Sequence, residues 1–253
     1  DNSGLSGLEF SLNDYLKGKN GRAFRTFSYA EPDILGAPTY ILNPESGYSI
    51  ELTIDANIQA KVYELVKQYV ESFNAKSGFA IVTDPSTNEV LAMVSYPSFD
   101  PANFKNILPN LPTAFNYEPG SIMKPVVALA ALDEGKLKLD DSFYCPGYIK
   151  VKDRVISCWQ KHGEEHGLVD IMVNSCDVAF ANIGLRVGKG ALVNYFKLFG
   201  FGEPTQLEIA GEEAGILPDV TKIGDVEVAN MAFGQGIAVT QMQMITALNA
   251  ITN

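Results

Sequence analysis

The sequence predicts an α+β protein, in which one antiparallel hairpin is followed by a run of helices. Residues 79–82 and 90–94 are apolar and strand-like, and they flank the turn signal Pro85-Ser86-Thr87-Asn88, which predicts a β-hairpin. Downstream, apolar residues recur at helical spacing over about 122–134, 168–187, 190–199 and 240–252. Strands followed by helices are typical of the α+β class.

A further helix is expected directly before the hairpin. Asp55 is a good N-cap, and the apolar residues after it follow a 3.6-residue period: Ile58, Val62, Leu65, Val66, Tyr69 and Phe73. Residues 1–50 are Gly-rich and polar, so we interpret them as an irregular arm or the tail of a preceding domain. Residues 51–253 form the main domain in this interpretation.

Composition limits the classes of partner. The chain has 253 residues, which suits one large domain with an arm, and its 46% apolar content is ample for a core. Its net charge of -11 argues against nucleic acid and against an anionic membrane surface as partners. No signal peptide is recognisable, and no apolar run approaches the length of a membrane-spanning helix.

The segment Tyr117–Pro125 has the pattern of an acyl-transfer nucleophile at the start of a helix. Pro119-Gly120 is a turn signal, and an apolar helical run follows Lys124. Because residues at i and i+3 share a helix face, Ser121 and the Lys124 amine can lie within hydrogen-bonding reach. A neighbouring amine can take the proton of a serine hydroxyl, and the helix N-terminus can stabilise an oxyanion. The alternative is a surface serine beside a solvated lysine.

Several short sequence motifs lie before and after this segment, in the following order along the chain. They are Gly7-Leu8-Glu9, Leu16-Lys17-Gly18, Leu52-Thr53-Ile54-Asp55 with Gln59, Asp84-Pro85, Leu91-Ala92-Met93, Tyr96-Pro97-Ser98-Phe99-Asp100-Pro101, the nucleophile segment, Ser175-Cys176-Asp177, and Phe233-Gly234-Gln235-Gly236 with Val239-Thr240. With these motifs, the chain resembles the transpeptidase region of class B penicillin-binding proteins of the division or sporulation type, which cross-link peptidoglycan. The resemblance covers nearly the whole chain.

The resemblance implies a fold, an activity and a place in the cell. The fold would be that of penicillin-binding proteins and serine β-lactamases, with helices on an antiparallel five-stranded sheet. The activity would be a serine D-Ala-D-Ala transpeptidase with Ser121 as nucleophile and Lys124 as its base. Its partners would be peptidoglycan stem peptides, β-lactam antibiotics and a glycan polymerase, at the extracytoplasmic face of the bacterial membrane.

Two further parts are expected on the same grounds. In the family, the part that corresponds to residues 1–50 links a pedestal domain to the catalytic domain. An N-terminal membrane helix anchors the protein, and we expect that helix before Asp1. Its third motif, Lys-Thr/Ser-Gly, follows the helix that ends this chain, so we expect that strand on a segment beyond or separate from these residues, the alternative being a truncated product.

Ser175-Cys176-Asp177 stands where the family has Ser-x-Asn. The resemblance implies that Ser175 relays a proton and that the third residue contacts the lysine or the substrate. Aspartate departs from the usual asparagine: a carboxylate accepts hydrogen bonds but does not donate, and it favours the charged form of Lys124. The alternative is an N-cap serine followed by an acidic first turn.

All the cysteines and histidines fall within 32 residues: Cys145, Cys158, His162, His166 and Cys176. This clustering favours a structural Zn²⁺ held by the three cysteines and one histidine. His166 is preferred over His162 because His166-Gly167 matches the loop-ending His-Gly of the family, some members of which hold zinc here. The alternatives are a Cys145–Cys158 disulfide and free thiols.

Four aromatic residues lie in this segment: Phe143, Tyr144, Tyr148 and Trp159. We interpret them as the small core of a stapled loop rather than as a substrate-facing rim.

Other functions stay open. A D,D-carboxypeptidase or β-lactamase would use the same serine but let water release the acyl group. A non-catalytic lactam sensor or cell-wall scaffold would keep the pocket without turnover.

Overall fold

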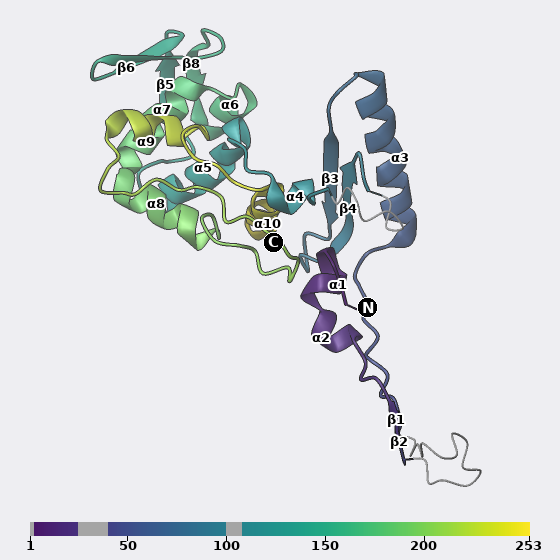
Figure 1. Ribbon diagram of the computed structural model, residues 1–253. Helices are drawn as coiled ribbons and strands as arrows, with labels where there is room; N and C mark the ends of the chain where they lie inside the picture. Colours follow the sequence, from purple (N-terminus) through teal and green to yellow (C-terminus); the bar gives the residue numbers. More distant parts are fainter. Residues whose placement is uncertain (1–2, 25–39, 100–107) are drawn as a thin grey trace, which may run out of the picture. The chain divides into compact units, whose positions relative to one another are not determined.

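The computed structural model describes residues 3–24, 40–99 and 108–253 (Figure 1). The chain forms two compact units, one of Asp1–Leu52 with Glu208–Ala210 and one of Thr53–Leu207 with Gly211–Asn253. Residues 25–39 of the predicted arm lie outside the described part, as do Asp100 and Pro101 of the motif that begins at Tyr96.

The first unit contains only short elements. They are the helices α1 (Gly7–Ser11) and α2 (Asn13–Leu16) and the antiparallel strands β1 (Arg22–Phe24) and β2 (Tyr40–Leu42). The Lys19 ammonium pairs with the Glu45 carboxylate at 2.7 Å, although both side chains are largely exposed. An exposed pair contributes little to stability.

The second unit begins with the predicted helix and hairpin. They are α3 (Ala56–Ser72), β3 (Gly78–Thr83) and β4 (Val90–Tyr96), with β3 and β4 antiparallel. The predicted N-cap is confirmed, since Asp55 accepts hydrogen bonds from the backbone N–H groups of Asn57 and Ile58 at 2.8 and 3.0 Å. The Gln59 side chain bonds both backbone groups of Met93, at 2.8 and 2.9 Å, and so ties helix to hairpin.

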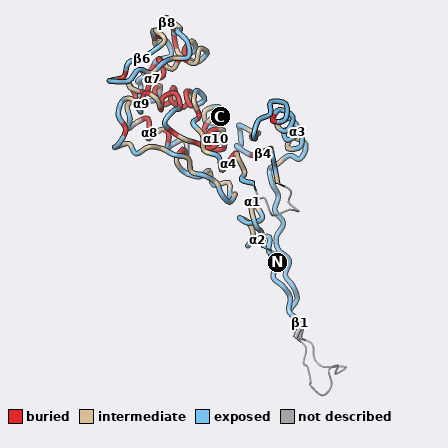
Figure 2. Tube along the Cα trace, turned by 45° about the horizontal axis from the view of Figure 1, so that its top comes forward, coloured by how far each residue is buried: buried red, intermediate tan, exposed pale blue. Residues whose placement is uncertain are grey.

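The rest of the second unit is mainly helical. Its elements are α4 (Leu111–Ala114), the 3₁₀ turn η1 (Gly120–Met123), α5 (Lys124–Asp133), α6 (Gly167–Val173), α7 (Asp177–Val187), α8 (Lys189–Leu198), α9 (Asp225–Met231) and α10 (Gln241–Thr252). Helix α5 contacts α7, α8 and α10, and most of its residues are buried. Figure 2 shows further buried residues in α7 and α10. The turn that carries Ser121 therefore leads into the centre of the core.

These elements confirm the predicted α+β class. The resemblance implies a five-stranded antiparallel sheet, and within the described residues β3 and β4 form a two-stranded one. The described residues also include no helix long and apolar enough to cross a membrane.

The predicted single helix over 168–187 is wrong, because two helices occupy it. Helix α6 ends in a Schellman motif, in which the N–H of Ser175 bonds the carbonyl of Met172 and that of Cys176 bonds the carbonyl of Ile171. Ser175 adopts the left-handed conformation at φ 50°, a position that glycine usually occupies. The chain then turns and α7 begins at Asp177.

Two small two-stranded antiparallel sheets fill residues 142–166, where we predicted no individual strands. They are β5 (Ser142–Cys145) paired with β8 (Gly163–His166), and β6 (Tyr148–Val151) paired with β7 (Arg154–Ser157). The aromatic core predicted here is wrong in part: Phe143 is buried, but Tyr144, Tyr148 and Trp159 are exposed.

Candidate active site

The segment that carries Ser121 is fixed to a distant loop. Tyr117 exchanges two backbone hydrogen bonds with Val239, at 3.0 and 2.9 Å, and Gly120 donates to the carbonyl of Gly234 at 3.0 Å. Ser121 is exposed in η1, one turn before the start of α5. These contacts hold the serine at the surface end of a buried helix.

Gly234 is required by the close approach of the two segments. A Cβ on this residue would lie 2.1 Å from the carbonyl oxygen of Gly120, and its φ of 80° is one that L side chains rarely adopt. The Phe233-Gly234-Gln235-Gly236 motif therefore provides a close backbone contact next to Ser121. Its last glycine donates a backbone hydrogen bond to the Glu118 carboxylate at 2.8 Å.

Lys124 is enclosed in the protein and held by the second motif. Only 1% of the residue is exposed. Its Nζ donates to the Ser175 carbonyl at 2.6 Å, to the Ser175 hydroxyl at 2.9 Å and to the Asp177 carboxylate at 2.7 Å. An ammonium has three N–H donors, so these three acceptors match the charged form of the lysine. The Phe180 ring lies 5.5 Å from the Nζ atom and adds a cation–π contact.

The contacts of Lys124 thus differ from those that we predicted. Lys124 contacts Ser175 and Asp177, but its hydrogen bonds within the described residues do not include Ser121. The break between α6 and α7 explains this arrangement, because it turns the Ser175 carbonyl and hydroxyl toward the lysine. The predicted 168–187 helix would have kept that carbonyl inside a helical ladder.

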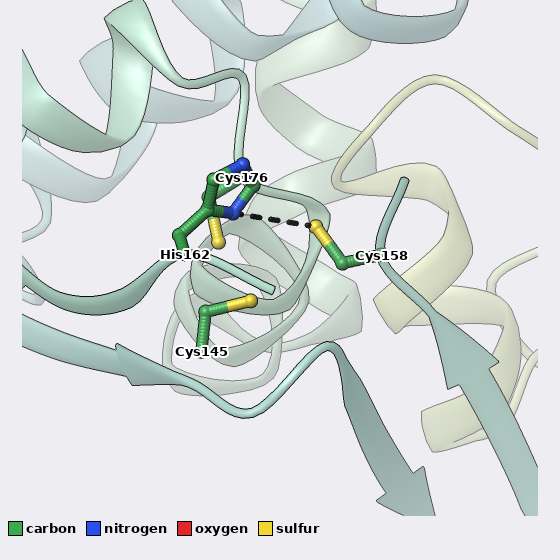
Figure 3. Close-up of side chains that lie close together, drawn as sticks. All are labelled: Cys145, Cys158, His162 and Cys176. Carbon is green, nitrogen blue, oxygen red and sulfur yellow. Dashed lines mark hydrogen bonds between the residues drawn. The ribbon is translucent and has the colours of Figure 1, made fainter. Parts of the chain in front are cut away.

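Four potential metal-binding side chains converge behind the second motif. They are Cys145, Cys158, His162 and Cys176, and their ligand atoms all lie within 4.8 Å of one another (Figure 3). The thiols are not joined in disulfides. The Cys158 Sγ and His162 Nδ1 atoms are 3.7 Å apart, and the His162 Nε2 atom is buried with no partner among the described residues.

The preference for His166 is corrected by this geometry. Strands β5 and β8 pair antiparallel, with Cys145 opposite Gly163 and Ser142 opposite His166. His166 therefore lies at the far end of the ladder from Cys145, exposed and 3.4 Å from the Ser142 hydroxyl. His162, directly before Gly163, reaches the thiols, and the pairing register was the information that the sequence lacked.

The thiol cluster caps the helix that carries Asp177. Cys176 is the N-cap of α7 and its Sγ accepts from the backbone N–H of Ala179 at 3.4 Å. The Cys158 Sγ accepts from the backbone N–H of Asp177 at 3.3 Å. The cluster is thus bonded to the same residue that pairs with Lys124.

A buried carboxylate that we did not predict lies beside the thiols. Glu165 is 1% exposed, and one of its oxygens accepts from the Asn174 side chain at 3.2 Å. Burial raises the pKa of the Cys176 thiol, and a hydrogen bond with Glu165 raises it further. A metal-free Cys176 therefore stays protonated at neutral pH. No periodicity in the Gly163–His166 strand pointed to a buried acid.

Comparison with protein families finds one match over most of the second unit. The model of the penicillin-binding protein transpeptidase domain matches residues 78–253.

Curated relatives match all or nearly all of the chain at moderate identity. Stage V sporulation protein D of Bacillus subtilis is 36% identical over 263 residues, which cover 100% of this chain and 40% of that protein. Peptidoglycan D,D-transpeptidase FtsI of Escherichia coli K12 is 30% identical over 251 residues, which cover 96% of this chain and 42% of that protein. The chain thus spans less than half the length of either relative.

Solved structures share the fold. Penicillin-binding protein 3 of Mycobacterium tuberculosis, in complex with aztreonam, superposes with a TM-score of 0.82 at 29% identity and covers 98% of this chain and 53% of that one. The transpeptidase domain of Burkholderia pseudomallei penicillin-binding protein 3 gives a TM-score of 0.73 at 28% identity, covering 81% and 58%.

Proposed function

Since the chain belongs to the penicillin-binding protein transpeptidase family, we propose that it is the catalytic part of a serine D,D-transpeptidase that cross-links peptidoglycan stem peptides. The name of the FtsI relative, a peptidoglycan D,D-transpeptidase, supports the reaction. The Ser121, Lys124, Ser175 and Asp177 arrangement supports the mechanism.

In the proposed reaction, the Ser121 hydroxyl attacks the carbonyl between two D-Ala residues of a stem peptide. The C–Oγ bond forms, the peptide C–N bond breaks, and the serine proton passes to the leaving D-Ala amine. A second stem peptide then offers its amine to the acyl-enzyme, which frees Ser121. Lys124 must give up a proton before it can accept one, and Ser175, 2.9 Å from Nζ, is placed to relay it.

The observation that carries the proposal is the enclosure of Lys124 by the second motif. A solvated lysine would need no such set of acceptors, whereas a buried amine bonded to a serine hydroxyl can move protons. Labelling of the full-length protein with a fluorescent penicillin tests it: the wild type should be labelled, and Ser121→Ala should not. Labelling that persists in Ser121→Ala would refute the proposal.

The rival enzyme function predicts a different fate of the acyl group. A carboxypeptidase or β-lactamase would pass it to water even when an amine is present, and a sensor or scaffold would keep it. Product analysis with a stem pentapeptide and an added amine separates them, because only a transpeptidase forms the amide. The proposed cellular context is the extracytoplasmic face of the membrane, beside a glycan polymerase and open to β-lactams.

We propose in addition that Cys145, Cys158, His162 and Cys176 hold one structural Zn²⁺. Zn–S bonds of about 2.3 Å and Zn–N bonds of about 2.0 Å in a tetrahedral site place S and N atoms about 3.5 Å apart, close to the 3.7 Å between Cys158 and His162. A bound cation would also offset the cost of burying thiolates. Bound zinc would fix the start of α7, and Lys124 and Ser175 would carry out the proton transfers.

A further inference from the structure

Among the described residues, two acidic or basic side chains are buried, and both contact the second motif or its neighbour. They are Lys124 and Glu165, each 1% exposed. Lys124 bonds Ser175 itself, whereas a Glu165 oxygen accepts a hydrogen bond from the side chain of Asn174, the residue before Ser175, at 3.2 Å. The proposed mechanism uses the lysine and gives the buried acid no role.

Strand β8 directs Glu165 into the protein. Glu165 stands opposite Phe143 of β5, which is also buried. The neighbouring Glu164 stands opposite Tyr144, and both of these residues are exposed. Because successive side chains of a strand point to opposite faces, the position of Glu165 on β8 places its carboxyl group on the buried face, where it meets the end of α6.

Asn174 is the C-cap of α6, and both its side chain and its carbonyl are held. The side chain donates to Glu165, and the carbonyl accepts from the indole Nε1 of Trp159 at 3.0 Å. The N–H of the same peptide group, which belongs to Ser175, bonds the carbonyl of Met172 at 3.1 Å. The peptide group that leads into Ser175 is therefore fixed at both of its polar atoms.

The backbone of Ser175 needs such support. Its φ of 50° is in the left-handed region, which is unfavourable for a residue with a side chain. Conformations of this kind persist where the contacts around them over-determine the geometry. Since φ is the rotation of Ser175 relative to the preceding peptide group, contacts that fix Asn174 also fix the direction of the Ser175 hydroxyl, which lies 2.9 Å from the Lys124 Nζ atom.

We propose that Glu165 is a positioning residue for the proton relay and that it acts through Asn174 on Ser175. In the relay, the Ser175 hydroxyl receives a proton from the Lys124 ammonium and gives its own proton to the leaving nitrogen, so a displaced hydroxyl impairs both transfers. Glu165 contributes a hydrogen-bond acceptor, for which a negative charge is not required. This inference rests on the transpeptidase function proposed above.

The test separates binding of a penicillin from acylation by it. Full-length protein is mixed with the penicillin in a stopped-flow instrument, which gives the Kd of the initial complex and the first-order rate constant of acylation. Glu165→Leu keeps a similar volume without the acceptor and should lower the rate constant by roughly ten- to a hundredfold, as a small displacement of a reacting group does. The Kd should stay within about twofold, because Glu165 acts on the chemical step.

Three further variants identify the contact. Glu165→Gln keeps an acceptor oxygen at the same place and should acylate within about threefold of the wild-type rate. Glu164→Leu makes the same change at the exposed neighbour on β8 and should leave the rate unchanged. Asn174→Ala breaks the same hydrogen bond from its other end and should reproduce the loss, also if Glu165→Leu does not fold.

Two double variants identify the route. Glu165→Leu with Asn174→Ala should be no slower than the slower single variant, because one contact can be lost only once. Glu165→Leu should likewise have no further effect in a Ser175→Ala background, where the relay is already absent. Losses that multiply in either case would overturn the proposal, since Glu165 would then act by another route, for example by holding zinc.

A merely structural role has a different signature. It would lower the fraction of protein that can be labelled, or the unfolding temperature, and leave the acylation rate constant of the labelled fraction unchanged, and that result would overturn the positioning role. If the wild type forms no penicillin adduct on Ser121, the proposed function itself fails. A normal wild-type adduct, with wild-type rate constants in both Glu165→Leu and Asn174→Ala, refutes the positioning role alone.

Discussion

Lys124 and Asp177 form an ion pair with 2.7 Å between the Nζ and Oδ1 atoms, and the lysine side chain is 2% exposed. They come from different helices, α5 and α7, and join the nucleophile segment to the second motif. Removing one member of a buried pair leaves the other charge without compensation, which is costly. The pair is therefore both a structural contact and the reservoir of the proton that the proposed mechanism moves.

Lys124→Ala should slow acylation of Ser121 by about 10²–10⁴-fold, the contribution typical of positioned proton transfer. Stopped-flow measurement of penicillin binding gives the rate constant. Lys136→Ala, at an exposed lysine shortly after the end of α5, is the matched control and should acylate at the wild-type rate. Equal rates for Lys124→Ala and wild type would remove the lysine from the mechanism.

Asp177→Ala should destabilise the protein by about 3 kcal/mol or more, because it leaves the Lys124 ammonium buried without its partner. Asp177→Asn keeps a side-chain oxygen that can accept from the Lys124 Nζ atom, so its loss of stability should be smaller. Thermal unfolding of the wild type and the two variants gives both values. Equal stabilities of all three proteins would show that this pair does not stabilise the fold.

Gly234→Ala should destabilise the protein by at least about 2 kcal/mol, because it adds a clash to a left-handed conformation. The new Cβ would stand 2.1 Å from the Gly120 carbonyl oxygen, which itself precedes Ser121. Thermal unfolding gives the stability, and acylation should slow as well. Gly190→Ala is the control: a Cβ there meets nothing within 4 Å in α8 and should stabilise the helix by up to about 1 kcal/mol. Equal changes in stability for Gly234→Ala and Gly190→Ala would contradict the close contact between Gly234 and Gly120.

The proposed zinc site predicts different results for substitution of His162 and of His166. His162→Ala should abolish stoichiometric zinc, and His166→Ala should retain it, because only His162 lies among the thiols. Metal analysis of protein purified without chelator gives the content. Loss of zinc should also reduce acylation, since the thiols bond the start of α7. Wild-type protein without metal, or zinc that follows His166 instead, would contradict the site.

The helix and hairpin at residues 55–96 could be predicted because their signals are local. An N-cap aspartate bonds N–H groups two and three residues on, and strand alternation needs no knowledge of distant residues. Helix α5 was predictable for the same reason. Its 3₁₀ first turn was not, since it depends on the backbone bond from Gly120 to Gly234.

The second motif shows what local signals miss. The 168–187 segment has unbroken helical periodicity, yet Ser175 adopts a positive φ without being a glycine or asparagine. Its conformation is supported by Lys124, which comes from 51 residues upstream. Likewise, both His162 and His166 offer an imidazole close in sequence to the cysteines, and only the register of β5 against β8 shows which of them lies beside the thiols. Both outcomes were decided by tertiary contacts.

Whether Ser121 is the acylated nucleophile can be measured by peptide mapping of the full-length protein after reaction with a penicillin. We expect one adduct per chain, located by mass spectrometry on the peptide that contains Ser121 and absent from Ser121→Ala. An adduct on any other residue, Ser175 included, would contradict it.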